Sequence, residues 1–275
     1  MLEPGTLSVG LAALLGALQG IAEFLPISSS GHLSLAQRWL AIPADAGGHS
    51  FNIVVHAGTL LAVLVHYGRD LLGLARASLT TPGEPRARAR RMIAAILLAT
   101  APLGLVLLPG LEDMIIAVEG APRRIGGCLL VTAALLAATQ ARGRDGAPDV
   151  APGPLQALGI GALQLFAVLP GVSRSGSTIA AGLALGLPRA AAARFSFLIS
   201  IPAILGATLK EGLDLLQAAP GSLAITPAAY LVGFAVSFVV GLVSLKALLS
   251  ILGRVGLWPF VPYLVLVGGL AIALG

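Results

Sequence analysis

Two short polar stretches in an otherwise apolar chain carry the residue types that could do chemistry. The first runs from Gln19 to His32 (QGIAEFLPISSSGH) and holds a carboxylate, three serines and a histidine. The second, PGVSRSGST over 170–178, holds an arginine among hydroxyl side chains. A charged side chain inside a bilayer is costly unless it faces a partner or water. We therefore expect both stretches to form functional sites.

The first stretch begins with a possible cation site. Gln19 and Glu23 are four residues apart, so on a helix their side chains share one face. Two oxygen-bearing side chains one turn apart can hold a hard cation such as Mg²⁺ or Ca²⁺. Zinc is not expected, because no second histidine or cysteine stands at ligand spacing. The alternative is that both side chains only hydrogen-bond to neighbouring helices.

The segment after Pro26 predicts a turn that binds an anion. Its hydroxyl and N–H groups can surround an anion at the positive end of a helix that starts near His32. His32 could serve as a general base, a general acid or a nucleophile. The alternative is that the serines only cap this helix and His32 is a satisfied polar residue. The predicted donors are Ser28, Ser29, Ser30 and Gly31.

The second stretch supplies a fixed positive charge. Arg174 is the only basic residue between Arg144 and Arg189. A guanidinium pairs well with phosphate oxygens, and hydroxyl donors at a helix start add to such a site. The alternative is an ion pair between Arg174 and Glu23, which can coexist with substrate binding. The surrounding predicted donors are Ser173, Ser175, Gly176, Ser177 and Thr178.

The composition places these stretches in a membrane. The chain of 275 residues is 57% hydrophobic and 11% charged, against about 25% charged in a soluble domain. The basic residues are spread over connecting loops, which argues against nucleic-acid binding. We therefore predict an all-α polytopic membrane protein. Small-residue helix faces could support a homodimer, although small residues occur throughout the chain.

The apolar segments differ in length. Two pairs of segments, 7–22 with 33–42 and 154–167 with 178–187, are too short to cross a bilayer and predict re-entrant helix pairs. The longer segments predict six spanning helices, over residues 50–68, 90–109, 124–141, 190–209, 227–250 and 256–274.

One short helix pair followed by three spanning helices occurs twice along the chain. GALQ at 16–19 recurs at 161–164, and the glycines that follow the two serine turns, Gly31 and Gly176, show the same shift of 145 residues. An odd number of spans in each half predicts inverted repeats, over approximately 1–142 and 150–275. Such repeats place their site at the repeat interface near the membrane midplane.

Arginine in the loops predicts the orientation. One set of loops carries most of the arginines and is predicted to be cytoplasmic. The two termini and the first helix pair then face outward, so that the site opens to the outer side. Trp39, Trp258 and Tyr263 are interpreted as interfacial anchors, and Arg189 and Arg194 as residues that reach the interface. The arginines of the cytoplasmic set are Arg69, Arg76, Arg86, Arg88, Arg90, Arg91, Arg142, Arg144 and Arg254.

These motifs resemble those of the bacterial undecaprenyl-diphosphate phosphatase family, also called the bacitracin-resistance family. The resemblance covers essentially the whole chain and rests on the acid motif at 19–23, FLPISSSGH at 24–32 and PGVSRSGST at 170–178. It implies a bacterial plasma-membrane enzyme that removes the terminal phosphate of a C55 isoprenoid diphosphate. That reaction recycles the lipid carrier for cell-wall synthesis.

The resemblance also implies residue roles. Glu23, with Gln19 beside it, would help to bind the divalent cation, and His32 and Ser29 would take part in catalysis. Glutamine at position 19 gives one negative charge fewer than a pair of carboxylates. His56, in HAGT, also fits the family pattern. Arg174, Ser173 and Thr178 would hold the diphosphate.

Two other classes of protein compete with this interpretation. SGH at 30–32 and SR at 173–174 superficially suggest the vanadium-haloperoxidase-like acid phosphatases. That family requires histidine and aspartate where this chain has Ala180 and Ala184, so we exclude it. The second class is a secondary transporter or lipid flippase, because inverted repeats with broken helices are typical of transporters.

Overall fold

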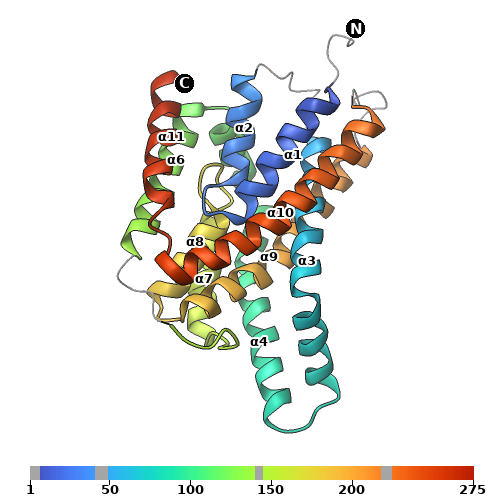
Figure 1. Ribbon diagram of the computed structural model, residues 1–275, viewed down its shortest axis with the longest axis vertical. Helices are drawn as coiled ribbons and strands as arrows, with labels where there is room; N and C mark the ends of the chain where they lie inside the picture. The colour runs from blue at the N-terminus through green and yellow to red at the C-terminus, as the bar shows by residue number, and fades with distance from the viewer. Residues whose placement is uncertain (1–6, 41–48, 140–144, 218–224) are drawn as a thin grey trace.

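The computed structural model describes residues 7–40, 49–139, 145–217 and 225–275 (Figure 1). The regular structure over these residues is entirely helical. The predicted helix end at Ile42 and the loop residues Arg142 and Arg144 lie outside the described residues. The helices are α1 (Val9–Phe24), α2 (Ser29–Trp39), α3 (His49–Leu79), α4 (Glu84–Thr100), the 3₁₀ helix η1 (Ala101–Leu107), α5 (Leu111–Glu119), α6 (Pro122–Ala138), α7 (Pro154–Phe166), α8 (Arg174–Ala184), α9 (Arg189–Gln217), α10 (Pro227–Val255) and α11 (Phe260–Leu274).

Several helices have the length and composition of membrane spans. Four described helical segments meet both criteria: Ser50–Leu79, Glu84–Leu107, Arg189–Lys210 and Pro227–Val255. A fifth span is possible if α5 and α6, which are bent by 97° at a short break, count as one. The prediction of a helical, multi-pass membrane protein is confirmed.

The predicted 256–274 span and the connection between the predicted spans 90–109 and 124–141 differ in the structure. Helix α11 begins only at Phe260 and has 15 residues, which makes it an apolar helix shorter than a usual span. Within that connection, Leu111–Glu119 folds into α5. Gly110, with φ of +87°, and Pro122, at the start of α6, interrupt the helical path on either side of α5.

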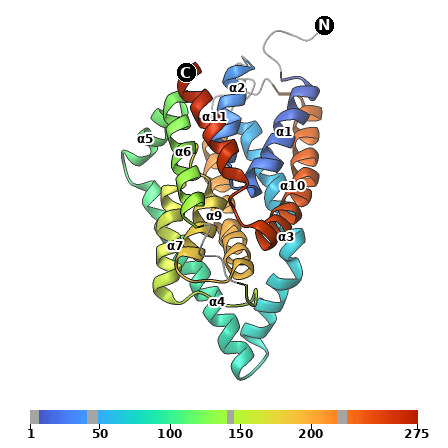
Figure 2. The same cartoon turned by 60° about the vertical axis from the view of Figure 1, so that its left-hand side comes forward.

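Helices α1 and α10 pack closely along their length, and α6 packs against α11 (Figure 2). The α1–α10 contact depends on glycine. A Cβ atom at Gly16 would lie 2.7 Å from the carbonyl oxygen of Gly233, and one at Gly20 would lie 2.8 Å from the nitrogen of Gly241. Such close backbone approach is how membrane helices gain packing energy without a hydrophobic driving force.

The two short helix pairs meet at their turns. Pro26 lies in the turn between α1 and α2, and Pro170 in the turn between α7 and α8. Ser28 has a φ of 73°, and its hydroxyl accepts a hydrogen bond from the backbone N–H of Gly171 at 3.0 Å. A Cβ atom at Gly31 would stand 2.8 Å from the backbone of Gly171. The sequence stretches around residues 19–32 and 170–178 therefore form one unit.

The Gly31–Gly171 contact gives a stability prediction. Gly31→Ala should lower the free energy of unfolding by about 1–3 kcal/mol, because the added methyl group overpacks two backbone turns. The matched control is Gly127→Ala on α6, where a Cβ atom meets nothing within 4 Å. Thermal unfolding in detergent checks both variants. If Gly31→Ala melts together with Gly127→Ala and the unchanged protein, the close contact is wrong.

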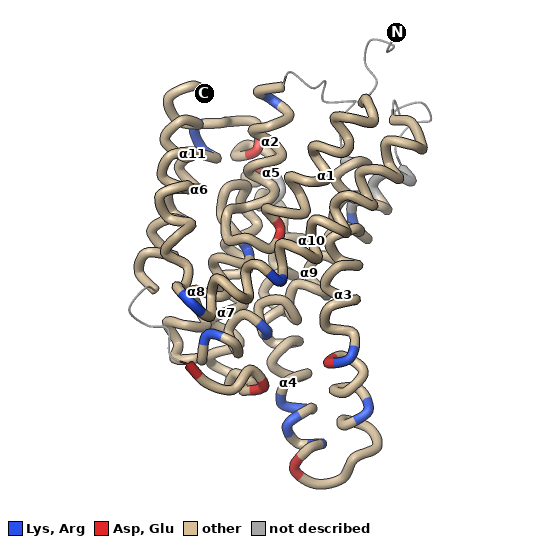
Figure 3. The backbone as a smooth tube through the Cα atoms, viewed as in Figure 1, with Lys and Arg blue, Asp and Glu red and all other residues tan. Residues whose placement is uncertain are grey.

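Charge is distributed unevenly along the molecule. Lysine and arginine gather toward the end where α3 finishes and α4 begins (Figure 3). Two arginines that were interpreted as interfacial residues form ion pairs within the chain. Arg194 Nε donates to Asp70 Oδ2 at 2.8 Å, and Arg189 Nη1 lies 3.2 Å from Asp145 Oδ1. Asp70 and Asp145 are far from α9 in sequence, so only the fold brings these pairs together.

Candidate active site

A buried ion pair joins the two polar turns. Glu23 lies at the end of α1 and Arg174 is the first residue of α8, and their side chains are 7% and 15% exposed. Arg174 Nη2 donates to Glu23 Oε1. The predicted alternative, a Glu23–Arg174 ion pair, is thus observed. Burial of this pair away from water strengthens the attraction and makes the loss of either partner costly.

The second oxygen of the Glu23 carboxylate has three polar neighbours. Ser29 Oγ donates to Glu23 Oε2 at 2.7 Å, and Gln19 Nε2 donates to the same oxygen at 3.0 Å. His56 Nε2, on α3, lies 3.8 Å from it, while His56 Nδ1 donates to the Asn52 carbonyl oxygen. The predicted residues Gln19, Glu23 and Ser29 therefore gather at one point, and His56 joins them.

Two buried polar atoms at this point have no hydrogen-bond partner. They are Gln19 Oε1, an acceptor, and Arg174 Nη1, a charged donor. Leaving a buried polar atom unpaired costs about 1–3 kcal/mol, and more if it is charged. A cation beside Gln19 and an anion beside Arg174 would each satisfy one of these atoms. The pattern fits a site for a metal ion together with a phosphate group.

His32 is held by both of its ring nitrogens. Nδ1 lies 2.9 Å from the Ser28 carbonyl oxygen, which can only accept a hydrogen bond, so Nδ1 carries the proton. In the neutral ring Nε2 then carries a lone pair and accepts from the Tyr263 hydroxyl at 2.8 Å. The Tyr263 ring also stacks on the imidazole, with centroids 5.6 Å apart. The hydrogen bonds thus assign the basic nitrogen of His32 to Nε2.

The contribution of Tyr263 is absent from the sequence prediction. An aromatic residue near the end of an apolar helix is typical of an interfacial anchor, and Tyr263 is 41% exposed. It is 231 residues from His32 in the chain. Thr132 on α6 was missed for the same reason: its hydroxyl donates to the Gly171 carbonyl oxygen and accepts from the Ser173 N–H. No local motif marks either residue.

Tyr263→Phe separates the hydroxyl from the ring. We expect kcat to fall by about two- to tenfold, the equivalent of one hydrogen bond, with little change in KM. The aromatic stack on His32 is retained, so the fold should be unaffected. Steady-state kinetics of phosphate release check this result. An unchanged kcat would show that the hydroxyl contributes nothing to the function of His32.

Most of the predicted hydroxyl donors have partners inside the two turns. Ser28 and Ser173 cap α2 and α8, and Thr178 bonds to the Arg174 carbonyl oxygen and to Ser196 on α9. Ser175 Oγ lies 3.2 Å from Ser173 Oγ and donates to the Leu25 carbonyl oxygen. These hydroxyls hold the shape of the turns in this structure.

The remaining predicted substrate-binding residues differ from one another in how deeply they are buried. Ser177 is fully buried, and its hydroxyl has no partner. Ser30 is partly buried beside Ser29 at the start of α2. Gly176 lies within α8, where a Cβ atom would come 3.2 Å from Pro26 of the other turn. Substrate contact by any of these residues stays a prediction.

Within the described residues, no group of three or more His, Cys, Asp and Glu side chains forms a metal site. A cation here would therefore have few protein ligands. Glu23 and Gln19 supply oxygen atoms and His56 supplies one nitrogen. Magnesium commonly binds through one or two carboxylates together with substrate phosphates. The donor set fits a cation that arrives with, or is completed by, a phosphate ligand.

The fold and this site define a helical membrane protein whose buried acid, arginine and histidine come from the turns of two short helix pairs. The chain belongs to the Bacitracin resistance protein BacA family, whose model matches residues 12–270. It is similar to a protein named undecaprenyl-diphosphatase from Trichlorobacter lovleyi, with 42% identity over 262 residues, or 94% of this chain and 93% of the relative. Proteins of the same name from Rubrobacter xylanophilus and Korarchaeum cryptofilum are each 40% identical, over 96% and 95% of this chain and 97% of each relative.

Proposed function

We propose that this protein hydrolyses undecaprenyl diphosphate to undecaprenyl phosphate and inorganic phosphate. The observation that carries the proposal is the buried Glu23–Arg174 pair with an unpartnered guanidinium nitrogen beside it. A lipid diphosphate offers phosphate oxygens for that nitrogen and an apolar tail for the bilayer. Full-length similarity to proteins named for this activity supports the same conclusion.

In the proposed mechanism, binding is mainly neutralisation of charge. Arg174 and the backbone N–H groups at the start of α8 hold the diphosphate. Phosphoryl transfer requires alignment of the attacking and leaving oxygens and stabilisation of charge on the transferred group. Water finally supplies the hydroxyl group that appears on inorganic phosphate, and the lipid monophosphate leaves with the bridging oxygen.

Two atoms are candidates for attack on phosphorus or for activation of water. His32 Nε2 carries a lone pair, because Nδ1 is committed to the Ser28 carbonyl oxygen. Ser29 Oγ donates to Glu23, so that carboxylate could accept the serine proton as the oxygen attacks. Tyr263 covers Nε2 and must move aside, or pass a proton, when substrate binds. A trapped phospho-enzyme would distinguish histidine from serine.

The proposed cation is Mg²⁺ or Ca²⁺, held by Glu23 and Gln19 with His56 nearby. It would neutralise charge on the phosphate oxygens. Because position 19 is glutamine, we expect a weak site. Gln19→Glu should lower the Mg²⁺ concentration needed for half-maximal activity, whereas Gln19→Ala should raise it. Titration of Mg²⁺ after treatment with a chelator measures this effect. Equal midpoints in all three proteins, or full activity in excess chelator, would contradict the cation site.

The proposed membrane arrangement has six spanning helices and two re-entrant pairs, α1–α2 and α7–α8, in two inverted repeats. The contact between Ser28 and Gly171 supports a meeting of the pairs within the membrane. The arginine-rich end near α4 would face the cytoplasm, and the site would open to the outer side. Labelling of single cysteines from each side of the membrane tests this orientation.

One assay tests the proposed activity directly. Purified protein, a polyprenyl diphosphate and Mg²⁺ or Ca²⁺ should yield one inorganic phosphate and one lipid monophosphate for each substrate consumed. Phosphate is measured colorimetrically and the lipid by mass spectrometry. Movement of labelled lipid across liposomes without phosphate release would instead identify a transporter.

A further inference from the structure

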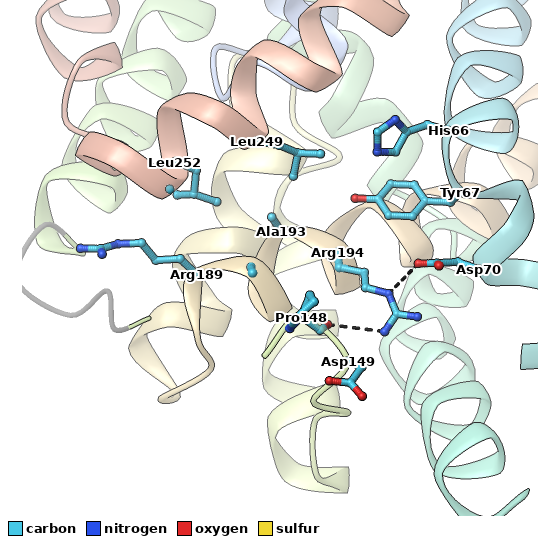
Figure 4. Close-up of a pocket in the computed structure, with 12 residues that line it drawn as sticks. His66, Tyr67, Asp70, Pro148, Asp149, Arg189, Ala193, Arg194, Leu249 and Leu252 are labelled. Carbon is cyan, nitrogen blue, oxygen red and sulfur yellow. Dashed lines mark hydrogen bonds and ion pairs between the residues drawn. The ribbon is translucent and has the colours of Figure 1, made fainter. Parts of the chain in front are cut away.

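A cavity lies between α3, α9 and α10, and its volume is about 410 Å³ (Figure 4). Pro148 and Asp149 contribute to its wall. Its described lining residues include none of the side chains that surround Glu23 and His32. Between the cavity and the candidate active site the aromatic rings of Tyr67, Phe197 and Phe24 pack in series. The two sites are therefore separate.

Two arginines from the first turns of α9 line this cavity. Arg194 donates through Nε to Asp70, and the remainder of its guanidinium makes only a long contact of 3.5 Å with the Pro148 carbonyl oxygen. Arg189 pairs with Asp145, whose side chain is 90% exposed. An exposed ion pair contributes little, so a ligand can take the place of that carboxylate. The positive end of α9 lies at the same place.

The hydroxyl of a largely buried tyrosine, Tyr67, also faces the cavity. Tyr67 is 6% exposed, and its hydroxyl has no hydrogen-bond partner among the described residues. Figure 4 shows the hydroxyl directed toward the cavity, near Arg194. The Tyr67 group is thus an available donor that a ligand in the cavity can satisfy.

The opposite wall is apolar. Leu249 and Leu252 of α10 and Ala193 of α9 line it. Two acidic residues also line the cavity. The Asp70 carboxylate is paired with Arg194, and the Asp149 carboxylate lies at the lower edge in Figure 4, so an anion fits only away from that edge. A ligand with one anionic end and one apolar end matches both walls better than a small hydrated ion does.

We propose that this cavity is a second binding site for a phosphate group, carried by a lipid whose chain lies along Leu249 and Leu252. Arg189, Arg194 and the Tyr67 hydroxyl bind the phosphate oxygens. The site is distinct from the one proposed for hydrolysis, so the two proposals can fail independently.

The test is calorimetric titration of detergent-solubilised protein with farnesyl phosphate, in a Glu23→Gln/Arg174→Gln background that removes the first site. We expect about one equivalent to bind, and Tyr67→Phe to weaken binding by about tenfold, the equivalent of a hydrogen bond to a charged group. Asp149→Asn should tighten binding, because it removes a negative charge at the edge. The matched control is Tyr230→Phe. Tyr230 lies at the start of α10, far from Leu249 and Leu252, and its hydroxyl donates to Ser50 on α3.

Further ligands separate the possible sources of binding. Farnesol measures the apolar contribution, and inorganic phosphate measures the anionic one. Tighter binding of farnesyl phosphate than of either supports the proposal. Equal binding of inorganic phosphate would overturn the lipid assignment. Equal binding of farnesol, no binding in this background, or identical affinity in Tyr67→Phe would overturn the site.

Discussion

Replacement of Arg174 by alanine is expected to reduce phosphate release from a polyprenyl diphosphate by about a thousandfold or more, the range found for arginines that stabilise a transferred phosphoryl group. Arg174 lies inside the protein, where its Nη2 neutralises Glu23 and its Nη1 has no partner. Its loss removes the proposed phosphate ligand and leaves a buried carboxylate unpaired. Initial rates measured at saturating and at limiting lipid check the effect on kcat and KM.

The controls separate catalysis from folding. Arg174→Lys keeps the charge but loses the planar pair of donors, so its activity should lie between those of the unchanged protein and Arg174→Ala. Arg254→Ala, at the exposed end of α10, removes an arginine without a contact to the site and should retain activity. Normal turnover by a folded Arg174→Ala protein would rule out the proposed phosphate contact.

The second large effect is expected at His32. His32→Asn should lower kcat by about a hundredfold to ten-thousandfold, the usual contribution of a general acid or base. Asparagine can place its amide nitrogen near the position of Nδ1 and keep the bond to the Ser28 carbonyl oxygen. What it lacks is Nε2. The loss should therefore fall on kcat, while lipid binding and thermal stability stay near those of the unchanged protein.

His32→Ala provides the comparison at the same position. It removes Nε2 and also the bond to Ser28, so it should lose activity to a similar degree and be less stable as well. Tyr263→Phe should show a much smaller defect than either variant. If His32→Asn retains full kcat, neither attack nor proton transfer by His32 is part of the reaction.

The polar turns were the most predictable part of the molecule. A carboxylate and an arginine within apolar helices are costly to bury alone, and that cost indicated a site at Glu23 and Arg174 before any geometry was known. Their pairing was foreseen as one of two alternatives. The membrane class was equally evident from composition, because long apolar segments reflect a simple requirement of the bilayer.

The contributions of distant helices were not predictable. Tyr263 and Thr132 reach the site from α11 and α6, and their positions depend on packing that no local pattern records. His56 on α3 fits the family pattern, but its position beside Glu23 was not predicted. For the serines, the sequence allowed two different roles. The hydroxyl of Ser28 could serve a ligand or a turn, and only the structure shows that it accepts the Gly171 N–H. The ends of the helices near Gly110 and Pro122 are set by the breaks in the helical path at these two residues.

The central claim is that Glu23 and Arg174, from two different turns, act as a single unit. A double-mutant cycle of kcat/KM for phosphate release tests it, with Glu23→Gln, Arg174→Gln and the two combined. Each single change leaves a partner unpaired in a buried site, so we predict large single losses and a double variant no worse than the poorer single one. Losses that multiply in the double variant would show that the two residues act independently, and would contradict the claim.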